Sequence, residues 1–262
     1  MARDEQDDDN LRCASGKARL YVDADLSINA IVTLDKDQSH YLVNVIRMSA
    51  GGRVLLFNGR DGEWAAEISD ASRKSATLTV TGQTRLHEPL PDIWLLFAPV
   101  KKARLDFIAQ KATEMGAAVI QPVLTRRTMV ARVKDQRLAA NVVEAAEQCG
   151  LVSVPEVRDA VKLDTLLANW SAENPTRRIL FCDEAAPPGG ALATIEAIAK
   201  SHPRGTPFAL LVGPEGGFDE AERANLLKRP DTHALSLGPR IMRADTAAIA
   251  ALAAIQLVLG DW

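Results

Sequence analysis

Apolar and polar positions follow two different patterns along the chain, and the change falls near residue 90. From Ala18 to about Glu88, short apolar runs alternate with turn-forming residues, which is typical of a small β unit. We expect strands at residues 19–22, 54–57, 64–68 and 76–80, hairpin turns at residues 58–59 and 61–62, and a short helix over residues 40–48. Two prolines between residues 86 and 91 predict a linker.

Beyond the linker, buried strands alternate with segments of helical period, which predicts an α/β domain with a parallel sheet. We expect strands at residues 92–100, 118–124, 179–182, 208–212 and 234–237. Helices are expected over residues 105–115, 135–149, 192–200, from 219 onward and from 245 to 259. Asp219 followed by Glu222 is a capping signal for the fourth of these helices.

Two glycine-bearing turns each connect an apolar strand to a helix near the end of the chain. The first reads Leu-Val-Gly-Pro-Glu-Gly-Gly-Phe (211–218), and the second reads Leu-Gly-Pro-Arg-Ile-Met-Arg-Ala-Asp-Thr-Ala (237–247). Such turns leave backbone groups unpaired beside a helix start, and glycine lets a ligand approach the main chain, although ordinary strand-to-helix connections look the same. Neither turn has the G-x-G-x-x-G or G-x-x-x-x-G-K-[ST] spacing, which argues against dinucleotide and nucleoside-triphosphate sites.

Composition changes this picture only in a few respects. The 262 residues suffice for one large or two modest domains, and the formal net charge is −3. Residues 1–10 hold five acidic side chains and one arginine, so residues 1–17 are expected to form a disordered acidic tail. No signal peptide or membrane span is expected. The three cysteines and four histidines lack disulfide or metal-ligand spacing, so we expect no metal site and a cytoplasmic location.

Positive charge is concentrated between residues 101 and 137, where nine Lys or Arg side chains stand against three acidic ones. This excess suits a nucleic-acid phosphate backbone, and the alternative is a solvated helix face with a charged loop. Lys101, Lys102 and Arg104 begin a helix, and Arg126 and Arg127 follow the next strand. If those strands are neighbours, both clusters lie at the carboxyl edge of the sheet, where ligands bind in open α/β folds.

The two turns together resemble the RsmE family of ribosomal RNA uridine methyltransferases, within the SPOUT class. Further matching blocks are Arg-Leu-Tyr-Val (19–22), His-Tyr-Leu-Val-Asn-Val-Ile-Arg (40–47), Gln-Lys-Ala-Thr-Glu-Met-Gly (110–116) and Glu-Ala-Ala-Glu-Gln (144–148), in the same order. The resemblance implies an α/β fold: a PUA-like β-barrel RNA-binding domain at residues 18–88, then a SPOUT domain at 89–262 whose parallel sheet ends in a trefoil knot.

The function implied by this resemblance is transfer of a methyl group from S-adenosyl-L-methionine to N3 of a uridine in small-subunit (16S) ribosomal RNA. Methylation of a ribose 2′-hydroxyl and a non-catalytic role in ribosome assembly remain alternatives. The resemblance also implies a homodimer that uses no metal. The resemblance implies that the protein binds the ribosomal RNA or the assembled small subunit.

Methylating an imide nitrogen requires a base for its proton and a cation for the charge on the neighbouring carbonyl oxygens. Arg243 is the candidate cation, with a salt bridge to Asp245 or to a dimer partner as the alternative. Asp245 or Glu215 is the candidate base, or orients Arg243 or a water. The expected cofactor-binding residues are Leu211, Val212, Gly213, Pro214, Glu215, Gly216, Gly217, Leu237, Gly238, Ile241, Met242, Arg243 and Ala247. The expected RNA-binding residues are Arg19, Arg47, Lys101, Lys102, Arg104, Lys111, Arg126 and Arg127.

Four positions depart from the family pattern. Met242, Ala244 and Asp245 stand where the family usually has Leu, Thr and Glu, and Leu151 stands where it has Arg. Methionine suits an apolar pocket, whereas the shorter Asp245 and the lost hydroxyl and guanidinium groups alter possible substrate contacts. Phe218 and Trp262 are expected in the core or an interface.

Overall fold

The structure is a computed structural model that describes residues 18–130, 133, 135–187 and 190–262. The expected acidic tail, residues 1–17, lies outside the described residues. The chain divides into two compact units. The first contains the chain up to Pro89 together with the later segment 146–154, and the second contains residues 90–145 and 155–262. The sequence pattern gave no sign that residues 146–154 return to the first unit.

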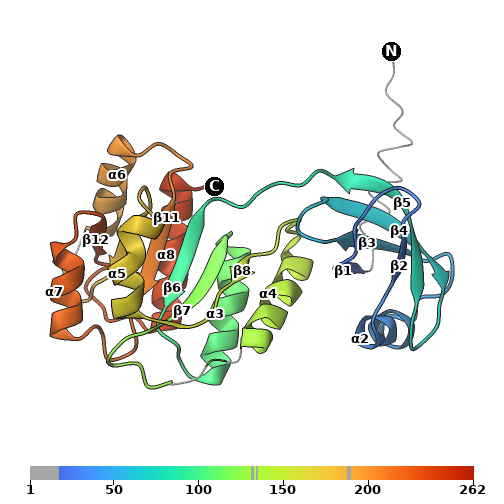
Figure 1. Ribbon diagram of the computed structural model, residues 1–262, viewed down its shortest axis with the longest axis horizontal. Helices are drawn as coiled ribbons and strands as arrows, with labels where there is room; N and C mark the ends of the chain where they lie inside the picture. The colour runs from blue at the N-terminus through green and yellow to red at the C-terminus, as the bar shows by residue number, and fades with distance from the viewer. Residues whose placement is uncertain (1–17, 131–132, 134, 188–189) are drawn as a thin grey trace, which may run out of the picture. The chain divides into compact units, whose positions relative to one another are not determined.

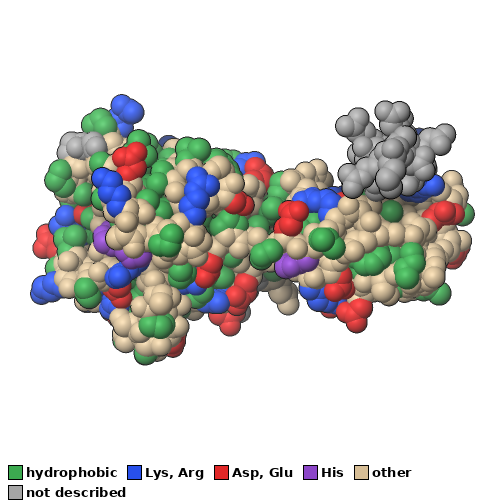
Figure 2. All heavy atoms as spheres, turned by 90° about the horizontal axis from the view of Figure 1, so that it is seen from above, with side chains coloured by type: hydrophobic (Ala, Val, Ile, Leu, Met, Phe, Trp, Pro, Cys, Tyr) green, Lys and Arg blue, Asp and Glu red, His purple; other side chains and the backbone are tan. Residues whose placement is uncertain are grey.

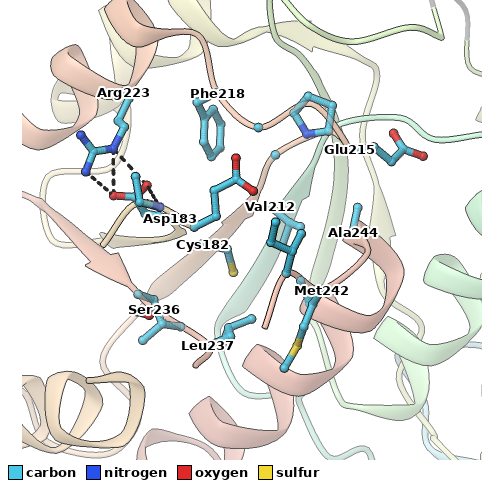
Figure 3. A pocket seen from close by; sticks show the side chains of 18 of the residues that line it. Cys182, Asp183, Val212, Glu215, Phe218, Arg223, Ser236, Leu237, Met242 and Ala244 are labelled. Carbon is cyan, nitrogen blue, oxygen red and sulfur yellow. Dashed lines mark hydrogen bonds and ion pairs between the residues drawn. The ribbon is translucent and has the colours of Figure 1, made fainter. Parts of the chain in front are cut away.

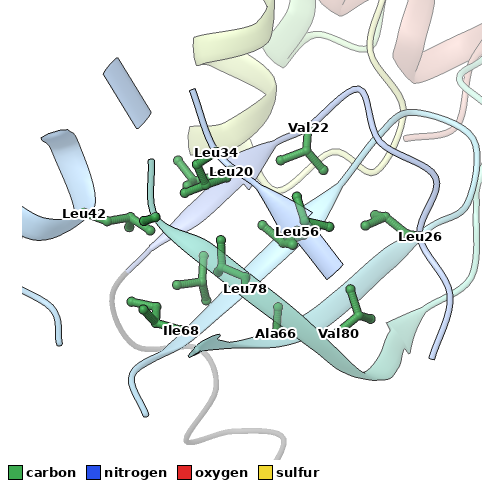
Figure 4. Close-up of a cluster of buried hydrophobic side chains, with 13 residues drawn as sticks. Leu20, Val22, Leu26, Leu34, Leu42, Leu56, Ala66, Ile68, Leu78 and Val80 are labelled. Carbon is green, nitrogen blue, oxygen red and sulfur yellow. The ribbon is translucent and has the colours of Figure 1, made fainter. Parts of the chain in front are cut away.

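The first unit is a curled five-stranded sheet around an aliphatic core (Figure 4). Its strands, in the sheet order β1-β3-β4-β5-β2, are parallel only where β1 meets β3. Leu20, Leu56 and Leu78 point into the core because alternate residues of each strand face inward. The bounds are β1 Arg19–Tyr21, β2 Ile31–Thr33, α2 Lys36–His40, a π-helix η1 Tyr41–Val45, β3 Arg53–Phe57, β4 Glu63–Asp70 and β5 Thr77–Arg85.

The second unit is built on a parallel sheet in the order β12-β10-β11-β6-β7-β8, with β9 also paired to β7 (Figure 1). β6 and β11 are buried at every position, as expected for central strands covered on both faces. The bounds are β6 Ile93–Phe97, β7 Val119–Leu124, β8 Glu156–Val157, β9 Val161–Lys162, β10 Arg178–Cys182, β11 Phe208–Val212 and β12 Thr232–Leu235.

Six helices in the described part of this unit flank the sheet. α5 and α7 contribute to a core that contains Trp94, Leu167, Trp170 and Leu226, whereas α8 packs on β11 with α3 and α6 beside it. The bounds are α3 Lys102–Glu114, α4 Asp135–Cys149, α5 Leu163–Glu173, α6 Ala191–Ser201, α7 Glu220–Lys228 and α8 Ala244–Leu259. The sheet therefore lies between two layers of helices, and its carboxyl edge is left to the loops that follow each strand.

Most expected elements are confirmed, and the differences have local causes. The last strand ends at Leu235, two residues before the predicted end, because Ser236 and Leu237 already belong to the turn. The helix expected over residues 40–48 is instead α2 followed by one π-helical turn, η1. β2, β8 and β9 were not predicted, since these strands are only two or three residues long. The sequence analysis also missed α5, which has 11 residues.

Candidate functional site

A cavity of about 450 Å³ opens at the carboxyl edge of the parallel sheet (Figure 3). The loops that follow three neighbouring strands, β10, β11 and β12, supply its walls, and the start of α8 completes them. This is the edge at which open α/β sheets bind ligands. The cavity therefore lies where both glycine-bearing turns were expected to place a site.

The first glycine turn has two positions that exclude a side chain. A Cβ atom at Gly213 would lie 3.0 Å from the ring of Phe218, which packs edge-on against Phe181. Gly217 has φ +68, and a Cβ there would lie 2.7 Å from Glu184 Oε1. The Gly217 amide donates to the Pro214 carbonyl at 2.9 Å, which closes the turn. These contacts fix the path of the backbone along the cavity.

The second glycine turn forms the opposite wall. Leu237 and Met242 line the cavity together with Ala244 and Ala247 on the first turn of α8 (Figure 3). Gly238 has φ +109, a conformation that favours glycine, so the chain can reverse between β12 and α8. Small alanines on the helix leave an apolar face that a flat ring could approach.

The loop after β10 adds a charged wall that sequence reasoning missed. Asp183 is 4% exposed, and both of its oxygens accept from Arg223 Nε at 3.0 Å, while Oδ2 also accepts from Arg223 Nη2 at 2.8 Å (Figure 3). This bonding raises the pKa of Arg223. The strand before it had been predicted, so the rule that ligands bind at strand carboxyl ends was the signal that could have found Asp183.

Cys182 ends β10 and lines the same cavity. Burial raises the pKa of its thiol to about 12, so the side chain is neutral at physiological pH. Its neighbour Glu184 also lines the cavity, as do Glu215 and Glu220. The described lining residues include four carboxylates and three arginines, and Asp183 and Arg223 among them form an ion pair.

The predicted cofactor residues divide into two groups. Ten line the cavity: Val212, Gly213, Pro214, Glu215, Gly217, Leu237, Gly238, Ile241, Met242 and Ala247. Three do not. Leu211 is wholly buried, because its side chain packs in the core that contains Trp170 and does not reach the cavity. The Gly216 carbonyl accepts a hydrogen bond from Arg127. Arg243 is exposed at the N-cap of α8.

The three catalytic candidates have different surroundings. Arg104 lies between the two carboxylates, with Nη1 3.5 Å from Glu215 Oε1 and Nε 3.7 Å from Asp245 Oδ2. The Arg243 side chain has no hydrogen bond or ion pair with any residue that the structure describes, and the carboxylate of Asp245 pairs with Arg104 instead. Asp245 instead faces Arg104, and it also accepts from the Thr246 amide at 3.0 Å.

Two arginines expected to bind RNA are bonded to the first glycine turn and to the helix start that follows it. Arg127 Nη1 donates to the Gly216 carbonyl at 2.8 Å, and Arg126 Nη1 donates to Asp219 Oδ1 at 2.8 Å. A backbone hydrogen bond from Ala221, together with Arg126, lowers the pKa of Asp219. Asp219 also begins α7 as the N-cap of a capping box, which confirms the sequence signal.

The remaining candidate RNA-binding residues differ in exposure and in whether they already form ion pairs within the protein. Arg19 already has partners in the protein: its side chain is 13% exposed, pairs with Glu63 and donates to the carbonyls of Ala146 and Leu151. Lys111 pairs with Glu114 at 2.7 Å. By contrast, Arg47 and Lys101 are exposed and have no ion pair among the described residues.

The side chain of Lys102 lies outside the described residues. On the face drawn in Figure 2, basic and acidic side chains are interspersed instead of forming one continuous basic patch. No group of three or more metal-ligating side chains occurs within the described ranges. None of the helices described is both long and apolar enough to cross a membrane.

Comparison with known proteins identifies relatives over nearly the whole chain. The model of an RNA methyltransferase domain matches residues 87–256, and that of an RNA methyltransferase PUA domain matches residues 34–81. The chain is 30% identical over 236 residues to the ribosomal RNA small subunit methyltransferase E of Bacillus subtilis, which covers 86% of this chain and 91% of that protein.

Two solved structures are similar as well. A methyltransferase from Legionella pneumophila in complex with the cofactor SAM has a TM-score of 0.81 and 28% identity, covering 94% of this chain and 100% of that one. The ribosomal RNA small subunit methyltransferase E of Neisseria gonorrhoeae bound to S-adenosyl methionine has a TM-score of 0.80 with the same identity and coverage. These matches confirm the predicted α/β fold with a parallel sheet and an N-terminal PUA domain.

Proposed function

The chain belongs to the ribosomal RNA small subunit methyltransferase E family of RNA methyltransferases, and from this premise we propose that it methylates N3 of a uridine in 16S ribosomal RNA with S-adenosylmethionine as methyl donor. The observation that carries the proposal is the cavity between the two glycine turns at the carboxyl edge of the sheet. Its walls coincide with ten of the thirteen residues expected to hold the cofactor.

The residues of the cavity fit this cofactor. The Gly213 and Gly217 positions keep the backbone open to a ligand, and Leu237, Met242 and Ala247 offer an apolar surface to the adenine. When bound, S-adenosylmethionine supplies an electrophilic methyl group on a positively charged sulfur, which keeps the electrons of the broken bond and becomes a neutral thioether.

The residues at the rim of the cavity supply the remaining chemistry. Glu215 or Asp245 accepts the N3 proton of the uridine, which leaves the ring nitrogen with the electron pair that forms the new bond. Negative charge then spreads over the two neighbouring carbonyl oxygens of the base. Arg243, exposed between the lining residues Met242 and Ala244, is the proposed cation that stabilises this charge.

We propose that the RNA contacts the exposed basic residues Arg47 and Lys101, together with Lys102, because the first two have no competing ion pair among the described residues. The substrate is the free ribosomal RNA or the assembled small subunit, and the reaction takes place in the cytoplasm. We also propose a homodimer. Leu257 on α8 and Trp262 near it are 60% and 49% exposed, and both offer apolar surface to a second copy.

Two measurements test the function. Calorimetry with S-adenosylmethionine should show binding by the purified chain, and no heat at millimolar ligand would contradict any methyltransferase role. Nucleoside mass spectrometry should find 3-methyluridine in 16S ribosomal RNA from wild-type cells and its loss in a deletion strain. The loss of a 2′-O-methylated nucleoside instead would assign the enzyme to ribose methylation.

Arg243→Ala tests the proposed cation. We expect turnover to fall by about two to three orders of magnitude, because a preorganised charge partner of the transition state is lost. The affinity for S-adenosylmethionine should change little, since the Arg243 side chain does not line the cavity. Turnover is measured with radiolabelled methyl donor at saturating RNA. Full turnover in the variant would remove Arg243 from the mechanism.

A further inference from the structure

Arg104 was expected to contact RNA phosphates, but its guanidinium lies inside the second unit between two carboxylates. It extends from the first turn of α3 toward Glu215 in the first glycine turn and Asp245 in the first turn of α8. The side chains of Arg104, Glu215 and Asp245 are 34%, 43% and 16% exposed, respectively. One cation therefore joins three elements that are far apart in sequence, and two of them carry the proposed proton acceptors.

The packing of α3 against α8 places Arg104 beside Asp245. α3 and α8 run side by side in the same direction, since Arg104 meets Asp245 at their starts and Met115 meets Gln256 near their ends. Gln256 Nε2 donates to the Met115 carbonyl at 2.6 Å. A Cβ atom at Gly116 would lie 2.8 Å from the same amide nitrogen, so glycine there leaves room for the Gln256 side chain. Both ends of α3 are thus tied to α8.

The charge balance of the trio suits proton transfer. Two carboxylates share one guanidinium, so one negative charge remains unpaired at the rim of the cavity. Glu215 lines the cavity, whereas Asp245 lies one residue beyond the lining residue Ala244. Without Arg104 the two carboxylates would repel each other, and the exposed Glu215 would be free to turn into solvent. The N–O separations of 3.5 and 3.7 Å still leave the guanidinium donors able to tighten when a substrate excludes water.

We infer that Arg104 is a positioning residue for methyl transfer, which holds Glu215 and Asp245 at the rim of the cavity in the arrangement needed to take the substrate proton. This inference rests on the proposed function. It gives the two arginines near the reaction different roles. Arg104 is held by carboxylates and acts through them, whereas the Arg243 side chain has no partner among the described residues and is left for the substrate. It also removes Arg104 from the set of residues that bind the RNA backbone.

The experiment compares Arg104→Ala, Arg104→Lys and the matched control Arg137→Ala. Arg137, on α4, pairs with Asp106 of α3, so its loss removes an arginine–carboxylate pair from the same helix without touching the cavity. Turnover is measured at saturating RNA and methyl donor. Binding of S-adenosylmethionine is measured by calorimetry, and RNA binding is measured without cofactor over a series of salt concentrations.

We expect Arg104→Ala to lower kcat about 10- to 100-fold, as is typical when catalytic groups lose alignment. Its dissociation constants for S-adenosylmethionine and RNA should stay within about twofold, and its RNA salt slope should be unchanged. Arg104→Lys should recover most of kcat because the ammonium keeps the charge between the carboxylates. Arg137→Ala should keep the wild-type kcat.

Three outcomes overturn the inference while leaving the proposed function intact. If Arg104→Ala kept the wild-type kcat but bound RNA more weakly and with a shallower salt slope, Arg104 would be a residue that contacts the RNA phosphate backbone. An equal fall in kcat for Arg137→Ala would assign the effect to the stability of α3. A fall in kcat that Arg104→Lys does not relieve would exclude a role for the charge. A wild-type chain that binds S-adenosylmethionine but methylates no RNA would overturn the proposed function, and this inference with it.

Discussion

Gly217 links a single backbone angle to the shape of the cavity. Its φ of +68 lies in the left-handed region, and the Glu184 carboxylate occupies the space where a side chain would begin. A residue with a Cβ costs about 1–2 kcal/mol in that conformation. Relief of that contact requires either the Glu184 side chain or the turn itself to shift, and both belong to the cavity wall.

Gly217→Ala is therefore expected to weaken S-adenosylmethionine binding about tenfold, as measured by calorimetry. Gly205→Ala is the matched control, because Gly205 has φ +85 in the connection before β11 with no atom within 4 Å of its Cβ position. Both variants should lose a similar amount of unfolding free energy, but only Gly217→Ala should lose cofactor affinity. Equal affinities in the two variants would contradict the role given to this turn.

Sequence reasoning identified residues whose role depends on local backbone chemistry. Gly213, Gly217 and the N-cap Asp219 were all found this way, since turns and caps are encoded within a few neighbouring positions. Sequence reasoning could not predict which groups in the fold pair with the charged side chains. Arg19 and Arg104 were assigned to RNA because a basic residue in sequence shows its charge but not the carboxylate that the fold brings to it.

At the scale of elements, Glu222 joins the start of α7 to the loop after β7. Its side chain is buried, and its two oxygens accept from the Asp219 amide at 3.1 Å and the Arg126 amide at 2.8 Å. Glu222→Gln keeps the shape but replaces one acceptor with a donor. An N–H group of the backbone is then left without its partner.

We expect Glu222→Gln to lower the free energy of unfolding by about 1–3 kcal/mol in urea titrations. Glu220→Gln is the control in the same helical turn, and since Glu220 is exposed it should cost less than about 1 kcal/mol through the helix dipole alone. A loss in Glu222→Gln no larger than in this control would show that the second hydrogen bond adds nothing to stability.

The long helices and central strands could be predicted because their apolar period extends over many residues. α4, β11 and α8 agree with expectation to within one residue. Short edge elements could not be predicted, because a strand of two residues such as β8 is too short to show an alternation of apolar and polar positions. The π-helical turn at Tyr41–Val45 is likewise invisible in the pattern, since one widened turn shifts the apolar face by less than the pattern resolves.

At the scale of the whole molecule, Arg19 explains how the first unit keeps residues 146–154. Its guanidinium stacks 3.8 Å from the centre of the Phe57 ring, pairs with buried Glu63 at 2.6 Å, and donates to carbonyls at the end of α4 and at Leu151. Cations near helix C-termini are favourable, and here the helix end becomes part of the β unit.

Arg19→Ala should lower the unfolding free energy by about 3–5 kcal/mol, because it leaves a buried carboxylate unpaired. Arg60→Ala serves as a control, since Arg60 pairs with the exposed Asp25 and should cost less than about 1 kcal/mol. Denaturant unfolding measures both. If Arg19→Ala left stability unchanged but weakened RNA binding, Arg19 would be an RNA-binding residue and not a structural one.

The order of strands in the sheet could not be read from the chain. Class and domain number follow from pattern and composition, but the pairing of β6 with β11 instead of β10 is set by tertiary packing. The domain bounds and the trefoil knot implied by family resemblance stay predictions.

The parallel alignment of α3 with α8 has a consequence for biosynthesis. The residues joined by the Gln256–Met115 hydrogen bond are 141 positions apart, so α3 leaves the ribosome long before its partner exists. At roughly 5–20 residues per second, the delay is on the order of ten seconds. During that interval the nascent chain carries the uncovered apolar face of α3 and a central strand, β6, that is paired on one side only, and both attract chaperones. Translation that stops before α8 would yield a product prone to aggregation and proteolysis.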